Sequence, residues 1–231
     1  MCKNPAGGEN LGGLTTIFGG LDWTILLSVV SILICLTIHE LAHGAAAYAL
    51  GDDTAKEMGR LTLNPIRHID PIGFVMLLLV GFGWARPVPV NMWKFQNPKF
   101  GMAITAMAGP LSNFILATVI FLLRVPLERL LLSGEVGFYA ARAIWATGGL
   151  SVFLGVFNLF PIPPLDGSKM LFALLPQAAY YRLMRYERYG MFLLFALIFF
   201  GFRTGFLLDI MSAVTTWMQG WTLPVSLWLF S

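Results

Sequence analysis

Residues Leu21–Leu50 form a 30-residue apolar stretch, LDWTILLSVVSILICLTIHELAHGAAAYAL, which contains no lysine or arginine. About 20 predominantly apolar residues span the hydrocarbon core of a bilayer as a helix. The stretch therefore predicts a transmembrane helix. It also contains TIHELAHG at residues 37–44. Ionisable side chains are costly inside a membrane, and they indicate a functional site there.

The rest of the chain shares this apolar character. Of its 231 residues, 57% are hydrophobic and 12% are charged, whereas about 25% are charged in a typical soluble domain. The composition therefore indicates an integral membrane protein. The formal net charge of +3 is small, and nothing in it suggests binding to nucleic acid. Cys2 and Cys35 are the only cysteines, so we expect neither a disulfide framework nor a cysteine-based metal site.

Further apolar segments predict additional crossings. They are Gly101–Leu123, Ala140–Ile162, Tyr189–Leu208 and about Ile210–Phe230. Ile72–Gly83 is also apolar but has only 12 residues, a length typical of a buried or re-entrant element. We expect an all-α polytopic membrane protein with about five to six transmembrane helices. A small membrane-associated β or re-entrant element would follow the first helix.

The polar connections leave no room for an extra soluble domain. We therefore expect one integral membrane domain over residues 1–231, with a core at 21–167 and C-terminal helices at 168–231. The first twenty residues lack the basic start, short apolar stretch and small-residue cleavage site of a signal peptide. The first apolar segment is accordingly expected to remain as a spanning helix.

The basic residues predict the orientation in the membrane. Gly167–Arg188 carries four basic residues against Glu187 alone, and Trp84–Phe100 carries three basic residues and no acid. Cytoplasmic loops are enriched in lysine and arginine, so both connections are expected on the cytoplasmic side. The N-terminal segment has only Lys3, which fits the opposite side. We expect a multi-pass protein of the cell membrane.

His39 and His43 are four residues apart, so on a helix they lie on one face, one turn apart. A single tetrahedral zinc ion can accept both imidazoles, and the adjacent Glu40 can reach a metal-bound water as general base. The alternative is a polar cluster that holds helices together by hydrogen bonds. Cys35, one turn earlier on the same face, is expected to be a small buried residue.

The position of the motif along the helix predicts its depth. His39 is eighteen residues beyond Leu21, or roughly 27 Å at 1.5 Å per residue. If Leu21 marks the outer boundary, the metal lies within the bilayer but towards its cytoplasmic side. Hydrolysis at that depth requires a polar cavity that admits water.

A catalytic zinc usually has three protein ligands and one open position. The remaining candidates are His68, the acids of the Gly51–Pro71 loop, Asp166 and Asp209. Asp166 follows the prolines of NLFPIPPLDG, where it could instead cap a helix starting at Ser168. If Ile72–Gly83 does not span, two crossings separate His39 from Asp166. An even number returns Asp166 to the side of the metal, which favours it as the third ligand.

Four motifs occur in order along most of the chain. They are HELAH at 39–43, GRLTLNPIRHIDPIG at 59–73, GPLSN at 109–113 and NLFPIPPLDG at 158–167. In these residues the chain resembles the site-2 protease family of intramembrane zinc metalloproteases, in a compact prokaryotic form without PDZ or CBS domains. The resemblance implies that His39, His43 and Asp166 bind one Zn²⁺ per chain and that Glu40 is the catalytic base.

The resemblance implies less specific roles for two further residues. Asn113 matches the asparagine of a G-P-x-x-N pattern, where an amide could bind the tetrahedral oxyanion or hold the substrate backbone. It could equally make an interhelical hydrogen bond. His68 could stabilise the transition state, cap a loop or be a solvated histidine. Asn158 has alternatives similar to those of Asn113.

The resemblance implies hydrolysis of peptide bonds within or near transmembrane segments of membrane protein substrates, with the lipid bilayer as surroundings. GRLTL and PVPVN could form strands that bind an unwound substrate by strand addition, or they could be interfacial loops. The alternative function is a non-proteolytic zinc-binding membrane protein or a transporter-like protein. Retention of Glu40 argues against the first, and the sequence lacks the internal repeats expected of the second. Cleavage of soluble peptides that enter the cavity is a third possibility. The sequence leaves the substrate and the oligomeric state open.

Overall fold

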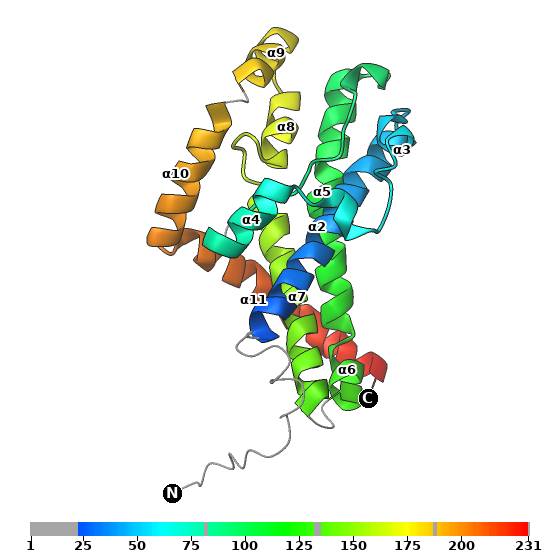
Figure 1. Ribbon diagram of the computed structural model, residues 1–231, viewed down its shortest axis with the longest axis vertical. Coiled ribbons are helices and arrows are strands. Elements are labelled where there is room, and N and C mark those ends of the chain that lie inside the picture. Colours follow the sequence, from blue (N-terminus) through cyan, green and yellow to red (C-terminus); the bar gives the residue numbers. More distant parts are fainter. Residues whose placement is uncertain (1–22, 81–82, 132–134, 187–188, 231) are drawn as a thin grey trace, which may run out of the picture.

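The structure is a computed structural model and describes residues 23–80, 83–131, 135–186 and 189–230. Several of the long helices run roughly along the vertical axis of Figure 1, and short helices lie at both its upper and its lower end. Within the described ranges the chain is helical and has no strand. Three helices are long and apolar enough to cross a membrane, or up to four if one bent pair counts as a single span. The chain is therefore an α-helical membrane protein.

The three long helices match three of the expected crossings. They are α2 (Trp23–Ala49), α5 (Pro98–Leu122) and α7 (Glu135–Asn158). Asn97 caps α5 by accepting a hydrogen bond from the Phe100 backbone N–H, and Pro98 occupies the first turn. Both features are favourable at a helix start. They explain why α5 begins three residues before the apolar segment does. Residues 21–22, where the first crossing was expected to begin, lie outside the described ranges.

The short apolar segment after α2 forms α4 (Pro71–Val80), and its two ends meet. Ile69 and Ala85 form an antiparallel bridge, and the Arg86 backbone N–H donates to the His68 carbonyl over 2.8 Å. Figure 1 places α4 level with the middle of α2. A segment whose ends lie together cannot connect opposite sides of a membrane. The segment therefore does not cross, as its length predicts.

The expected strands do not form in the described part of the chain. Residues 59–63 and 87–91 have no strand pairing, and the Ile69–Ala85 bridge is isolated. Pro87 and Pro89 have no N–H to donate to a ladder, which disfavours pairing of the second stretch. The element after α2 is thus a short helix with an isolated bridge rather than a small sheet.

The C-terminal third differs from the expected pair of spans. Tyr189–Leu208 and Ile210–Phe230 were expected to cross, but the structure has α10 (Gly190–Arg203) and α11 (Phe206–Phe230), bent by 78°. Gly205, with φ 78°, supplies the left-handed residue at the break. The 14 residues of α10 rise only about 21 Å, which is short for a crossing. The remaining helices are α3 (Thr54–Glu57), η1 (Pro65–His68), η2 (Met92–Lys94), α6 (Arg124–Leu131), α8 (Asp166–Ala173) and α9 (Gln177–Tyr186).

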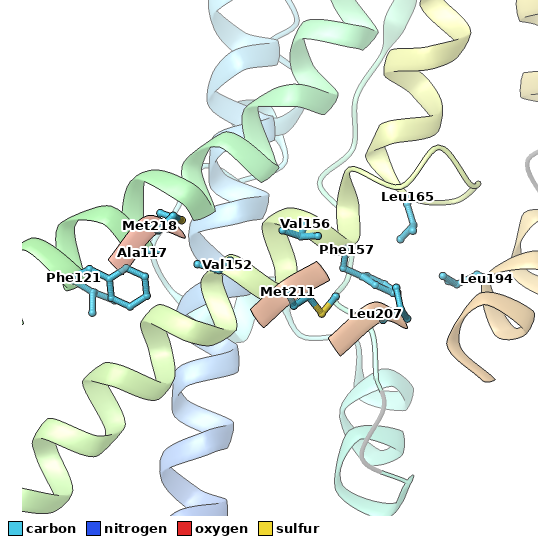
Figure 2. Close-up of a cluster of buried hydrophobic side chains, with 11 residues drawn as sticks. Ala117, Phe121, Val152, Val156, Phe157, Leu165, Leu194, Leu207, Met211 and Met218 are labelled. Carbon is cyan, nitrogen blue, oxygen red and sulfur yellow. The ribbon is translucent and has the colours of Figure 1, made fainter. Parts of the chain in front are cut away.

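A cluster of buried apolar side chains holds α5, α7 and α11 together. Figure 2 shows its side chains along the contacts of these helices, with Leu165 and Leu194 added from the segment before α8 and from α10. Phe121 lies against Gly148 of α7, where an added Cβ would lie 2.7 Å from its ring. In a membrane, close van der Waals packing of this kind holds helices together, since lipid competes for apolar surface. The cluster fixes the spacing of α5 and α7. The GPLSN motif lies in α5, and the NLFPIPPLDG motif begins at Asn158, the last residue of α7.

Asp52 connects the end of α2 to the segment before α5. Its carboxylate is fully buried and accepts from Thr54 N over 3.1 Å and from Asn91 N over 2.6 Å. The neighbouring Asp53 is exposed, and its hydrogen bond from Lys94 lowers the pKa of the Asp53 carboxyl. An exposed ion pair contributes little to stability. Asp52 is therefore the anchor that holds residues 87–91 near α2.

Candidate metal centre

His39 and His43 occupy one face of α2, as their spacing predicts. Both side chains are buried, and their Nε2 atoms lie 3.0 Å apart. Their rings meet edge to face, with centroids 4.5 Å apart. The two imidazoles therefore converge on one point between α2 and α5.

Asp166 joins them from the first residue of α8. Its Oδ2 lies 3.1 Å from Nε2 of His39 and 3.1 Å from Nε2 of His43. The ligand atoms of all three residues lie within 4.8 Å of one another. The expected alternative, that Asp166 caps the helix, does not hold, because Leu165 occupies the cap position and its carbonyl accepts from Ser168 N.

A close approach of the backbone brings Asp166 to the histidines. α7 ends at Asn158, before the prolines of residues 161–164. A Cβ on Gly167 would lie 2.2 Å from the Leu159 carbonyl oxygen, so only glycine fits there. The chain thus turns back tightly against the end of α7. The turn directs the Asp166 carboxylate inward.

The donor atoms of this group suit zinc. Two imidazole nitrogens and one carboxylate oxygen form a ligand set of catalytic zinc sites, which keep a further position open for water or substrate. All three side chains are buried, and a bound cation would balance the charge of the Asp166 carboxylate. Within the described ranges these residues form the one group of at least three His, Cys, Asp or Glu side chains close enough to hold a metal ion.

A cavity of about 350 Å³ opens beside the group. This volume holds several water molecules, since one needs roughly 30 Å³. The cavity therefore has room for water beside the three side chains. Its walls include His39, Glu40, His43, Pro87, Val88, Val90, Met102, Thr105, Ala106, Asn158, Pro164, Asp166, Lys169 and Met184.

Glu40 lies on the wall of this cavity next to the first histidine. Its Oε2 accepts a hydrogen bond from the Val88 backbone N–H over 2.8 Å. The segment that carries Val88 is itself held by Arg60, whose Nη2 donates to the Arg86 carbonyl over 2.6 Å. Glu40 is therefore held at a defined position beside the metal ligands.

The structure gives different surroundings to Asn113, Asn158 and His68, whose roles the sequence left open. Asn113 is fully buried, and its Nδ2 lies 3.2 Å from Nδ1 of His39, behind the ring. Asn158 lines the cavity and donates from Nδ2 to the Leu154 carbonyl over 3.0 Å. His68 instead lines a small pocket between α2 and α4. Its Nε2 hydrogen bonds to the Thr62 carbonyl over 2.8 Å.

The other expected ligands lie elsewhere. Asp52 bonds to backbone N–H groups, and Asp53 contacts Lys94. Asp70 accepts from the Gly73 N–H over 2.8 Å at the start of α4. Asp209 is exposed in the first turn of α11. None of these acids belongs to the metal-binding group found in the described residues.

Three residues around the site were missed at the sequence level. Nδ1 of His43 donates to the Thr105 carbonyl over 2.7 Å. A Cβ on Gly109 would lie 2.4 Å from Nε2 of that histidine. Lys169 brings its Nζ to 4.0 Å from Oδ1 of Asp166. Gly109 belongs to the GPLSN motif and lies one turn from both Thr105 and Asn113, so the four-residue spacing was an available signal.

Comparison with known proteins gives consistent results. The model of the family described as Peptidase family M50 matches residues 131–201, a range that includes Asp166. Three similar proteins carry names that begin "Putative zinc metalloprotease". YwhC of Bacillus subtilis (strain 168) is 43% identical over 175 residues, which cover 74% of this chain and 78% of that protein.

The other two relatives come from other organisms. Rip2 of Mycobacterium tuberculosis (strain ATCC 25618 / H37Rv) is 29% identical over 241 positions, which cover 94% of this chain and 83% of that protein. MJ0611 of Methanocaldococcus jannaschii is 31% identical over 162 positions, which cover 67% of this chain and 75% of that protein. No solved structure matches the chain. The similarity to YwhC extends over most of both proteins, and the chain therefore belongs to peptidase family M50, the family of the site-2 proteases.

Proposed function

We propose that this membrane protein is a zinc metalloendopeptidase that hydrolyses peptide bonds within or near transmembrane segments of other membrane proteins. The observation that carries the proposal is the convergence of two α2 histidines and Asp166 beside a cavity with Glu40 on its wall. Family membership supports a peptidase. The lipid bilayer is its surroundings, and membrane proteins are its substrate class.

Nε2 of His39, Nε2 of His43 and Oδ2 of Asp166 would hold one Zn²⁺ per chain. When bound, zinc acidifies a water molecule and polarises the carbonyl to be cleaved. Glu40 would accept a proton from the attacking water as the water oxygen bonds to the carbonyl carbon, and would pass it to the amine nitrogen as the C–N bond breaks. The hydrogen bond from Val88 to Oε2 keeps the carboxylate oriented toward the cavity during both transfers. Lys169, on the cavity wall, brings its ammonium to 4.0 Å from the Asp166 carboxylate.

The segment Pro87–Asn91 is the proposed contact for an unwound substrate. A peptide bond in a helix is shielded by the helix's own hydrogen bonds, so the substrate must unwind before cleavage. Pro87, Val88 and Val90 line the cavity. The N–H groups of Val88 and Asn91 already donate to Glu40 and Asp52. Strand addition would therefore use the Val90 N–H and the carbonyls of this segment.

We propose one membrane domain over residues 1–231 in a multi-pass protein of the cell membrane. By sequence, ten of the 15 lysines and arginines fall in the connections at 51–71, 84–100 and 167–188, which supports a cytoplasmic location for those connections. His39 is about 24 Å from the start of α2 at 1.5 Å per residue. The active site would then lie inside the bilayer towards the cytoplasm.

We also propose that α4 is re-entrant, entering and leaving the membrane on the cytoplasmic side. The bridge between Ile69 and Ala85 supports this placement. With α2, α5 and α7 crossing, five transmembrane segments in total would require α10 and α11 to cross separately. The 25 residues of α11 rise about 37 Å, which is enough for one crossing.

Zinc content and cleavage, measured together, test the proposal. Wild type, Glu40→Gln, Asp166→Ala and the control Asp209→Ala would be purified and reconstituted in liposomes with a panel of transmembrane peptides. We expect about one zinc per chain and cleavage in wild type and Asp209→Ala, zinc without cleavage in Glu40→Gln, and loss of zinc in Asp166→Ala. Removal of zinc with a chelator should abolish wild-type cleavage, and restored zinc should recover it.

Two outcomes would contradict the proposal. Zinc bound equally by Asp166→Ala and wild type would remove Asp166 from the ligand set. Cleavage that survives in Glu40→Gln would exclude Glu40 as the base. The non-proteolytic alternative predicts zinc binding with no cleavage of any peptide, but a binding site alone does not explain a carboxylate held beside the ligands on the cavity wall.

A further inference from the structure

The two ring nitrogens of His39 face different partners. Nε2 lies 3.1 Å from Asp166 Oδ2, in the group that could hold a metal. Nδ1 points the other way, to α5, where it lies 3.2 Å from Asn113 Nδ2. Both side chains are buried. The asparagine is therefore the group that meets the back of the imidazole.

An imidazole that binds a metal through Nε2 carries its proton on Nδ1 and donates it to an acceptor. His43 satisfies this requirement, because its Nδ1 lies 2.7 Å from the Thr105 carbonyl oxygen. A carbonyl can only accept, so it fixes the proton on Nδ1 and leaves Nε2 for the metal. His39 needs an equivalent acceptor.

Asn113 has such an acceptor. Its Oδ1 is buried and makes no hydrogen bond to any described residue. Oxygen and nitrogen of an amide have nearly the same size, so a half-turn of the side chain exchanges their positions. The half-turn would bring Oδ1 to the Nδ1–H of His39.

The position of Asn113 argues against contact with substrate. It is fully buried and is absent from the residues that line the cavity. Its own carbonyl accepts from Ser151 Oγ over 2.8 Å, which links it to α7. Thr105 and Asn113 are eight residues apart, so they lie on one face of α5. That face supplies the hydrogen-bond acceptors of both histidines.

We infer that Asn113 is a positioning residue that accepts the Nδ1 proton of His39 and so presents Nε2 to the metal. It does not bind the oxyanion of the substrate. The inference rests on the proposed zinc site. It adds a prediction that the proposed function does not make, namely that one amide oxygen behind the ring sets the affinity for zinc.

The test compares zinc affinity in four full-length proteins in detergent, by competition with a chromogenic chelator. Beside wild type, the variants are Asn113→Leu, which removes the acceptor, Asn113→Asp, which keeps an acceptor but has no donor, and the control Thr222→Val, which removes a buried hydroxyl of α11 that does not line the cavity. We expect Asn113→Leu to bind zinc 10–100-fold more weakly. Asn113→Asp and Thr222→Val should bind it as wild type does. At saturating zinc, Asn113→Asp should still cleave.

Other outcomes would overturn the inference. If Asn113 binds the oxyanion, Asn113→Asp should hold zinc but lose about 100-fold or more in cleavage rate. If it only joins helices, Asn113→Leu should lower the unfolding temperature without changing zinc affinity. Should Asn113→Leu fail to fold, the cleavage rate of Asn113→Asp still decides. A wild type that binds no zinc would contradict the proposed function itself.

Discussion

Gly109 of α5 lies directly against the rings of His39 and His43 in α2. A Cβ at this position would lie 2.4 Å from Nε2 of His43 and 2.7 Å from Cε1 of His39. Both neighbours belong to the proposed metal ligands, and neither ring can move away without changing the geometry of that site. We therefore predict that Gly109→Ala abolishes or severely weakens zinc binding, measured by metal analysis after dialysis, and that cleavage is lost with it.

Gly149 provides the matched control, because a Cβ added at this position of α7 would meet no atom within 4 Å. Replacing a glycine inside a helix by alanine is favourable by roughly 0.5–1 kcal/mol where the methyl group has room. Gly149→Ala should therefore keep zinc and cleavage and unfold at the same or a higher temperature. Wild-type zinc content in Gly109→Ala would show that the contact with the histidines is not restrictive.

At the scale of single residues, the sequence predicted the candidate ligands that follow from helical spacing or from the number of membrane crossings. The pair His39 and His43 follows from helical geometry, and Asp166 follows from counting crossings. Gly109 and Thr105 were missed because their contacts depend on how closely α2 and α5 pack, which no local pattern encodes. His68 lies in a family-like motif, but the fold turns it toward α4 and away from the cavity.

Among the elements, the segment 87–91 is held in place by polar anchors rather than by strand pairing. Asp52 accepts from the Asn91 N–H over 2.6 Å. Its loss would leave that donor and the Thr54 N–H unpaired. We predict that Asp52→Ala destabilises the protein by about 1–3 kcal/mol and slows cleavage, because Val88 would no longer hold Glu40. Thermal unfolding and peptide cleavage in liposomes measure the two effects.

Asp53→Ala is the control for this prediction. Asp53 is exposed and pairs with Lys94, and such pairs contribute at most about 1 kcal/mol. Its removal should leave cleavage unchanged. Equal effects of the two substitutions would mean that the buried hydrogen bonds of Asp52 do not anchor the segment.

The same region shows what element-level patterns can and cannot predict. The twelve apolar residues at 72–83 predicted a short element that does not cross, and α4 agrees. The strands expected at 59–63 and 87–91 are absent from the described chain. Pro87 and Pro89 disfavour pairing of the second stretch, because proline has no N–H to donate to a ladder.

Over the whole molecule, the sequence predicted an α-helical membrane protein but not the course of its C-terminal third. Hydropathy alone divides 189–230 into two apolar stretches. It does not reveal the left-handed Gly205 or the 78° bend between α10 and α11. Packing of α11 against α5 and α7 in the apolar cluster decides its direction, and such contacts depend on the complete fold.

The direction of each long helix leads to a prediction about sidedness. Figure 1 places α3 and α9 at one end of the molecule and α6 at the other. Single cysteines would replace Lys56 in α3, Arg182 in α9 and Arg129 in α6, in a Cys2→Ser background that keeps the buried Cys35. In intact cells, we expect a membrane-impermeant thiol reagent to label only Arg129→Cys. All three positions should react after the cells are opened.

This pattern depends on α4 returning to the side from which it came. If α4 crossed the membrane, Lys56 and Arg182 would lie on opposite sides, and one of them would be labelled in intact cells. In that case three crossings, made by α4, α5 and α7, would lie between His39 and Asp166. An odd number of crossings would place these two residues on opposite sides of the bilayer. The labelling of Arg182→Cys therefore tests the re-entrant element and the ligand set together. If neither Arg182→Cys nor Lys56→Cys is labelled in intact cells, an even number of crossings separates α2 from α8. Asp166 of α8 then lies on the same side of the membrane as the histidines.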